Sequence, residues 1–159
     1  MTNINFYVSN QDGLEHRLNI AYKLIGHALK RQLFIHIHTD SEDMSKHIDN
    51  WLWTLDKPSF IPHRVISQTI DAADDEAESN LKTNKEEIAI KEKITISHNH
   101  EPLGKCDYLI NLSVQLPSFF SRFTKLAEVL DNSDEILAAG RKRYVFYRDR
   151  GYTLAYHKL

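Results

Sequence analysis

The apolar and polar residues of the first third of the chain alternate between the periods of a β-strand and an α-helix. Apolar side chains occur at every second position in two short stretches, and between and after these stretches they recur at helical spacing. Asp40 or Ser41 can cap the second helical stretch, and Pro58 ends it. The predicted elements are, in order, a strand at residues 4–9, a helix at residues 12–31, a strand at residues 33–39 and a second helix. This order predicts an α/β fold with a parallel sheet.

The remainder of the chain contains shorter elements of the same kinds. Asn132 and Glu135 match a capping box, which would begin a helix that ends near Gly151. The stretch 123–130 fits either a helix or a strand. The other predicted elements are strands at residues 88–97, 108–113 and 152–157 and a helical turn at residues 117–122. Together these elements predict a single α/β domain over residues 1–159.

A loop and an acidic segment separate the two groups of elements. Residues 57–63 contain two prolines and are typical of an extended apolar loop. Residues 67–87 contain seven acids, two lysines and few large apolar side chains. This composition predicts a mobile acidic insertion rather than a packed element.

The composition of the 159 residues excludes several classes of protein. Hydrophobic residues make up 42% and charged residues 26%, as in ordinary globular chains. The single cysteine, Cys106, excludes an intramolecular disulfide framework, and we expect it to be a buried structural thiol. No apolar run is long enough to span a bilayer, and the first residues do not resemble a signal peptide. We therefore expect a cytoplasmic protein that does not act at a membrane.

The net charge of -2 results from two opposed segments. The acidic segment carries a net charge of -5, whereas residues 141–159 contain six bases and one acid, a net charge of +5. The small total argues against a general coat for DNA, which would need a large basic excess. The local excess of bases is suited to an acidic partner.

Catalytic or cofactor chemistry has little support in the sequence. His36 and His38 lie two apart on a predicted strand, and His98 and His100 repeat this spacing, so each pair could chelate a metal ion. No third ligand at a recognisable local distance completes either pair. The loop after the first strand has one glycine and none of the glycine-rich patterns that bind phosphate. We expect no cofactor and no metal, and a nucleotide- or metal-dependent enzyme on a doubly wound sheet stays the alternative.

An aromatic cluster after the second strand has the composition of a binding surface. Trp51 and Trp53 lie about 100° either side of Leu52 on a helix, so they cannot both be central to the core. Phe60 follows between two prolines. Aromatic anchors dominate interface energies, which favours a hydrophobic docking patch. The alternative is a small satellite core in which Phe60 folds back on the helix.

The last predicted helix offers a second surface. Positions 141, 144, 145 and 148 share one helix face, which presents two arginines beside Tyr144 and Val145. Arginines bind carboxylates, and an aromatic floor holds an apolar side chain, so this face suits an acidic peptide with an apolar end. One alternative is a solvated basic face with buried tyrosines behind it. Another is direct stacking of single-stranded DNA on the aromatic rings.

Several short motifs occur in a specific order along the chain: Phe6-Tyr7, Leu52-Trp53, Ser59-Phe60-Ile61-Pro62-His63, the stretch 141–147 and Gly151-Tyr152. In order and spacing they resemble the chi subunit of bacterial DNA polymerase III, an accessory protein of the clamp-loader assembly. The resemblance covers nearly the whole chain.

This resemblance implies a three-layer α/β/α fold with a mostly parallel central sheet, without a nucleotide site or catalysis, and makes residues 124–130 a strand. It also implies two partners. One is the acidic C-terminal tail of single-stranded DNA-binding protein, which ends in proline and phenylalanine. The other is the psi subunit, which links chi to the clamp loader and whose surface a repair helicase can share. The free subunit would be monomeric and would meet DNA only indirectly.

The resemblance also suggests which residues bind each partner. In the family, residues matching Arg141 and Tyr144 lie in the tail pocket, and residues matching Trp53 and Phe60 lie on the psi side. Together with the helix face described above, the predicted tail-binding residues are Arg141, Lys142, Tyr144, Val145 and Arg148. The predicted psi- or helicase-binding residues are Trp53, Phe60, Ile61 and Pro62.

Two positions depart from the family pattern. Better-known members carry lysines where this chain has Leu137 and Val145, so the pocket is less basic at these points unless Lys142 or Arg148 substitutes. The acidic insertion is also longer than usual. With these departures noted, the resemblance implies a non-catalytic adaptor that couples the replicative polymerase to coated single-stranded DNA.

Overall fold

The structure is a computed structural model that describes residues 1–54, 64–65, 93–98, 102 and 104–159. No helix within these residues combines the length and the apolar character that a membrane crossing requires. The strands are β1 (Asn3–Val8), β2 (Ile35–His38), β3 (Arg64–Val65), β4 (Ile94–Ser97), β5 (Tyr108–Asn111), β6 (Lys125–Leu130) and β7 (Thr153–Lys158). The α-helices are α1 (Leu14–Lys30), α2 (Glu42–Thr54) and α5 (Asp134–Asp149), and a short 3-10 helix, η3, spans Phe120–Arg122.

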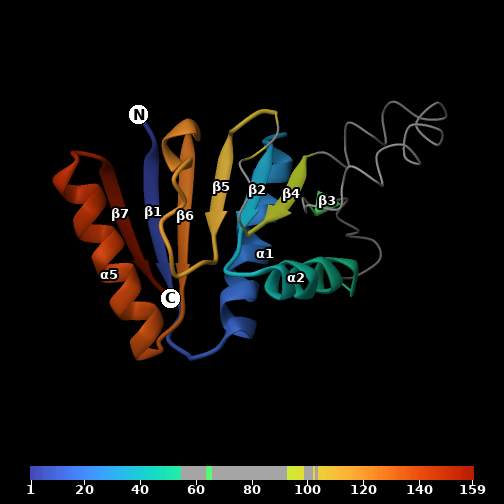
Figure 1. The fold of residues 1–159 in the computed structure, drawn as a ribbon, viewed down its shortest axis with the longest axis horizontal. Helices are drawn as coiled ribbons and strands as arrows, with labels where there is room; N and C mark the ends of the chain where they lie inside the picture. Colours follow the sequence, from blue (N-terminus) through green and yellow to red (C-terminus); the bar gives the residue numbers. More distant parts are fainter. Residues whose placement is uncertain (55–63, 66–92, 99–101, 103) are drawn as a thin grey trace.

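The described strands form one sheet in the order β3-β4-β2-β5-β6-β1-β7, and each of their pairings is parallel. β1 lies between β6 and β7, so the first and last strands of the chain are neighbours at one edge of the sheet. Figure 1 shows α5 beside β7 and β1 at this end and α2 at the opposite end. The α5 end carries the candidate site.

The two faces of the sheet pack against different helices because side chains alternate along each strand. On one face, α1 and α2 cover apolar residues of the central strands, among them Ile35, Ile37, Ile94, Ile96 and Ile110. On the other face, α5 and η3 cover a second cluster that includes Ile4, Phe6, Leu126, Leu130 and Tyr147. The predicted three-layer α/β/α fold with a mostly parallel sheet is confirmed.

Most of the predicted elements are confirmed within a few residues of their expected bounds. Ser41 caps α2, because its Oγ accepts the backbone N–H of Met44 at 3.1 Å. The ambiguous stretch before residue 130 is the strand β6. The predicted strand at 88–97 is β4 from Ile94 onward, and its earlier residues lie outside the described ones, as do the loop 57–63 and the acidic insertion 67–87.

The predicted capping box of Asn132 and Glu135 is wrong. The residue before α5 is Ser133, and its side chain makes no capping hydrogen bond to the helix. Its Oγ and its backbone N–H both donate to Asp131 Oδ1, at 2.5 and 2.9 Å. Asp131 therefore organises the turn into α5, and the sequence signal of the box was a coincidence of residue types.

Candidate functional site

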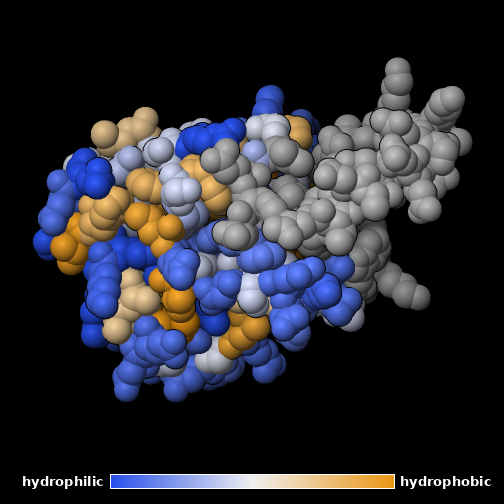
Figure 2. Space-filling view, viewed as in Figure 1, coloured by the Kyte–Doolittle hydropathy of each residue, from blue (hydrophilic) through white to orange (hydrophobic). Residues whose placement is uncertain are grey.

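A cleft lies between α5 and the strands β1 and β7, and we call it the α5 cleft. Its volume is about 560 Å³. Its floor comes from the apolar residues Phe6, Val8 and Leu130, and α5 forms one wall. The described residues that line it are Phe6, Val8, Leu130, Asn132, Leu137, Gly140, Arg141, Tyr144, Val145, Tyr156 and Lys158. Over α5, Figure 2 shows apolar side chains between polar ones.

The position of α5 over the sheet depends on a glycine and a set of aromatic rings. A Cβ at Gly140 would lie 2.5 Å from Leu130 Cδ1, so the absence of a side chain allows the helix to approach β6 closely. Tyr144 packs edge-on against Phe6, with 5.3 Å between ring centroids, and Tyr147 is fully buried beside them. These contacts hold α5 close to the sheet and set the height at which Arg141 and Val145 stand above the floor.

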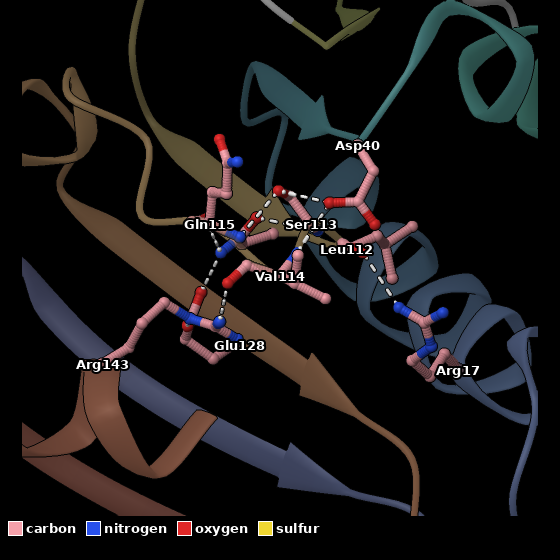
Figure 3. Close-up of polar contacts among 9 residues, drawn as sticks. Arg17, Asp40, Leu112, Ser113, Val114, Gln115, Glu128 and Arg143 are labelled. Carbon is pink, nitrogen blue, oxygen red and sulfur yellow. Dashed lines mark hydrogen bonds and ion pairs between the residues drawn. The ribbon is translucent and has the colours of Figure 1, made fainter. Parts of the chain in front are cut away.

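A buried ion pair attaches α5 to the sheet. The Arg143 Nε donates to Glu128 of β6, and both side chains are buried. Asn111 also donates to Glu128, at 2.5 Å, and Arg143 Nη1 donates to the carbonyl of Val114 at 2.7 Å (Figure 3). Because its charge is compensated inside the protein, Arg143 contributes little to the basic surface that the sequence predicted from residues 141–159.

A matching ion pair attaches α1 on the opposite side. Arg17 Nε lies 3.3 Å from Asp131 Oδ2, and Arg17 Nη1 donates to the carbonyl of Leu112 at 2.9 Å. Burial acts to raise the pKa of Asp131, but hydrogen bonds from Ser133 and Gly13 and the charge of Arg17 outweigh it and hold this pKa below its ordinary value. The carboxylate is therefore ionised in the folded protein at neutral pH.

The carboxyl ends of the strands are occupied by the protein's own polar groups. In doubly wound sheets the ligand crevice lies at this edge, where neighbouring strands lead to opposite faces. Here Asp40, after β2, accepts hydrogen bonds from the Ser113 hydroxyl and the Val114 N–H, both at 2.8 Å (Figure 3). Arg17 and Asp131 meet beyond the ends of β5 and β6. Asp40, Ser113 and Asp131 are therefore hydrogen-bonded within the fold, and Arg17 Nε, which makes no hydrogen bond, lies against the Asp131 carboxylate.

The α5 cleft is suited chemically to an acidic chain with an aromatic or aliphatic end. Arg141 and Lys158 stand exposed at its rim and provide two cations. Val145 and Tyr156 are 42% and 55% exposed and line the same cleft, so they offer apolar and aromatic contact surface there. A carboxylate can bind the guanidinium while an apolar side chain enters between the rings and the floor.

The structure brings together three of the five predicted tail-binding residues. Arg141, Tyr144 and Val145 line the cleft. Lys142 and Arg148 are exposed on α5 but are not among the lining residues, and Arg148 forms an exposed ion pair with Asp149 at 3.4 Å.

Sequence reasoning missed other residues of the cleft. Tyr156 and Lys158 come from β7, and helix periodicity carries no information on which strand lies beside a helix. By contrast, the resemblance already indicated Leu137 as a pocket position one turn before Arg141, and the structure places it in the cleft wall. The two positions that depart from the family pattern, Leu137 and Val145, therefore both line the same cleft.

The predicted psi-side surface falls largely outside the described part of the structure. Phe60, Ile61 and Pro62 lie outside the described residues, and the side chain of Trp53 is not described. Trp51 is half-buried and meets Tyr22 of α1 edge-on, with 6.4 Å between ring centroids. Trp51 therefore contributes to the contact between α1 and α2.

Two of the candidate metal ligands, His36 and His38, pack against an aromatic ring. His36 and His38 point to the α5 face of the sheet, and Phe119 contacts both rings. Burial lowers the pKa of His36 to about 3 and the pKa of His38 to about 4. The described residues contain no group of three or more His, Cys, Asp or Glu side chains arranged to hold a metal ion, and His100 lies outside them.

Cys106 is half-buried rather than buried as expected. Its Sγ lies 3.6 Å from the carbonyl oxygen of Gly104, and burial raises the pKa of the thiol. A raised pKa reduces the fraction of reactive thiolate, which is consistent with the structural role predicted for this residue.

Comparison with known proteins agrees with the motifs. A family model described as "DNA polymerase III chi subunit, HolC" matches residues 1–155. The chain is 28% identical over 159 residues to the DNA polymerase III subunit chi of Pseudomonas aeruginosa, which covers 100% of this chain and 98% of that protein. It is 27% identical over 119 residues to the DNA polymerase III subunit chi of Haemophilus influenzae, covering 75% of this chain and 71% of that protein.

Proposed function

The chain belongs to the DNA polymerase III chi subunit family, and we propose that it is a non-catalytic adaptor between the polymerase and single-stranded DNA-binding protein. Family membership makes it a bacterial replication accessory subunit. The finer proposal is that the α5 cleft binds the acidic C-terminal tail of single-stranded DNA-binding protein. We also propose that a second surface, which includes Trp53, Phe60, Ile61 and Pro62, binds the psi subunit, and that the protein acts in the cytoplasm.

One observation carries the tail-binding proposal: an arginine and a lysine stand at the rim of a cleft whose floor is apolar. Arg141 can form charge-assisted hydrogen bonds with the terminal carboxylate. Tyr144, Val145 and the floor residue Phe6 offer contact to a terminal phenylalanine ring. The neighbouring Lys158 supplies further positive potential for upstream acidic residues of the tail.

The proposal can be tested by anisotropy titration of a fluorescent acidic peptide that ends in Pro-Phe. Replacing Arg141 by Ala should cost about 1.5 to 3 kcal/mol of binding free energy, the range for hydrogen bonds to a charged group, which is roughly a 10- to 150-fold loss of affinity. Removing the terminal phenylalanine from the peptide should weaken binding comparably, because the apolar floor would then stay empty.

Arg148→Ala is the matched control, since it removes the same side chain from the same helix outside the cleft lining. We expect less than about a twofold change, as for other exposed ion pairs. If Arg148→Ala and Arg141→Ala weaken the peptide equally, binding is a general attraction to the basic helix and the proposed cleft is wrong.

The psi-side surface needs a separate measurement. Phe60→Ala should reduce co-elution with the psi subunit in size-exclusion chromatography, because an aromatic anchor is removed. The affinity for the tail peptide should not change if the two surfaces are distinct. Loss of both interactions in this variant would contradict the two-surface proposal.

A further inference from the structure

A second groove lies on the face of the sheet opposite the α5 cleft, and we call it the α1 groove. It lies between the carboxyl-terminal half of α1 and the uncovered part of β1 and β7, and its volume is about 550 Å³. Side chains alternate along β1, so Asn5 and Tyr7 face this groove while Phe6 and Val8 face the α5 cleft. The two grooves therefore share strands but not side chains.

Apart from two tyrosines, the ionisable side chains that line the α1 groove are basic. His27 and Arg31 come from the end of α1 and are exposed, and Lys125 begins β6 and is half-buried. The described lining residues include no carboxylate. A groove with bases on both walls attracts an anionic chain.

Further bases continue along the same edge of the sheet. Because the strands are parallel, their amino ends lie together, and Lys93 and Lys105 precede β4 and β5 there. The ammonium group of Lys105 lies 5.6 Å from the ring centre of Phe34. The carboxylate of Asp107 at this edge accepts the backbone N–H of Phe34 at 2.9 Å, so it is turned into the fold.

Aromatic and amide groups lie among these basic side chains. The Tyr7 ring is half-buried and stacks on His157, with 4.8 Å between centroids and 15° between ring planes. Tyr108 is half-buried beside it, and the side chain of Asn3 is exposed. Aromatic rings stack on nucleobases, and amides offer hydrogen-bond donors and acceptors to the edges of nucleobases. An acidic peptide would need only the basic side chains.

We propose that the α1 groove binds a short stretch of single-stranded DNA. Arg31 and Lys125 contact backbone phosphates, and nucleobases lie beside the stacked rings of Tyr7 and His157 and the exposed amide of Asn3. The formal charge of -2 argues only against coating DNA over the whole surface. A local groove with two cationic side chains and a histidine can make a weak contact while the tail of another protein occupies the α5 cleft.

The experiment titrates the protein alone into a fluorescein-labelled 15-nucleotide dT strand at 50 mM salt. The double variant Arg31→Glu/Lys125→Glu should weaken binding at least tenfold. The double variant Lys142→Glu/Arg148→Glu on α5 has the same change of net charge and should weaken it less than threefold. Since Lys125 is half-buried, Arg31→Glu/His27→Glu, which changes two exposed residues, serves as a second variant with the same expected loss.

Specificity and salt dependence complete the test. With two phosphate contacts, a plot of the logarithm of the association constant against the logarithm of the salt concentration should have a slope of about -1.4. Three outcomes would overturn the proposal. They are no binding of the dT strand at 50 mM salt, an equal loss of affinity in the α1-groove and α5 variants, and poly-glutamate binding as tight as that of the dT strand. A preference for an RNA strand of the same sequence would also overturn it. The tail peptide should bind the α1-groove variants normally, so the two proposals fail independently.

Discussion

The two faces of the sheet beside β1 and β7 are built alike but expose different chemistry. On each face a helix is attached to the β6 region by a buried arginine: α5 through Arg143 and Glu128, and α1 through Arg17 and Asp131. The cleft beside α5 has an apolar floor, whereas the groove beside α1 is lined by bases, amides and tyrosines. The same framework therefore supports two surfaces suited to different ligands.

The alternation of side chains along one edge strand explains how the surfaces stay separate. Tyr156 and Lys158 of β7 line the α5 cleft, and Thr153 and Ala155 line the α1 groove. Because a change at one position alters one face only, each face can be changed without direct effect on the other. The following predictions test how far this independence goes.

The largest expected effect is a loss of unfolding free energy that differs between the two buried ion pairs. Arg143→Met leaves Glu128 buried without its cation and should cost about 3–5 kcal/mol of unfolding free energy. Arg17→Met should cost less, about 1–3 kcal/mol, because Asp131 keeps its hydrogen bonds from Ser133 and Gly13. Urea unfolding followed by circular dichroism measures both.

A second substitution distinguishes the loss of the charge pair from the loss of packing. Combining Arg143→Met with Glu128→Leu removes both charges and should restore most of the stability, since a buried pair can be replaced by apolar groups at little cost. If the double variant is as unstable as Arg143→Met alone, the pair is not the attachment that we describe.

The next effect is a pH dependence that arises on the α5 face of β2. Burial lowers the pKa of His36 to about 3 and that of His38 to about 4, whereas unfolded histidine has a pKa of about 6.5. Below pH 6.5 the unfolded chain binds more protons, so stability is complete above this pH and falls towards pH 4. Each histidine should cost about 2 kcal/mol at pH 5.

Measuring unfolding free energy between pH 7 and pH 5 tests this assignment. His38→Gln should reduce the loss of stability over this range by about 2 kcal/mol. His47→Gln, at an exposed position of α2, is the control and should leave the slope unchanged. On the α1 face of the same strand the side chains are Ile35 and Ile37, which do not titrate. A slope that survives His36→Gln/His38→Gln would place the acid sensitivity elsewhere.

Much of the fold could be predicted from local sequence patterns. The parts that could not be predicted are those that depend on long-range contacts. The helix spacing of residues 12–31 and the short apolar strands predicted the α/β order correctly. The pairing of β1 with both β6 and β7 joins residues more than a hundred positions apart, which periodicity cannot show. The capping box at Asn132 failed because Asp131, whose partner Arg17 is equally distant, controls that turn.

The candidate site was predictable only on the helix side. The face shared by Arg141, Tyr144 and Val145 follows from helical spacing alone. The sequence counted Arg143 among the surface bases, because no local pattern shows that α5 packs this arginine over Glu128 of β6. The α1 groove was missed because its bases come from elements that are brought together only by the parallel sheet.

A pair of helix glycines offers a smaller test of the two faces. Adding a Cβ at Gly140 of α5 would place it 2.5 Å from Leu130, whereas a Cβ at Gly26 of α1 would meet no atom within 4 Å. Gly140→Ala should therefore lower stability by about 1–3 kcal/mol through overpacking. Gly26→Ala should raise it by about 0.5–1 kcal/mol, the cost of a glycine within a helix.

Thermal unfolding of both variants, with the tail-peptide titration, measures these effects. Gly140→Ala should also weaken the peptide, since Leu130 and Gly140 line the α5 cleft, and Gly26→Ala should not. If both substitutions stabilise the protein, the position of α5 over β6 does not depend on the missing side chain at Gly140.

The smallest expected effect adds one charge to each face. Val145→Lys places an ammonium group at the rim of the α5 cleft and should strengthen the acidic peptide by about 0.5–1 kcal/mol, or roughly two- to fivefold at low salt. Ala155→Lys adds the same charge to the α1 groove and should strengthen the dT strand instead. Because exposed charges are screened, both gains should shrink at 0.5 M salt. If either lysine strengthened both ligands equally, the two faces would act as one basic surface.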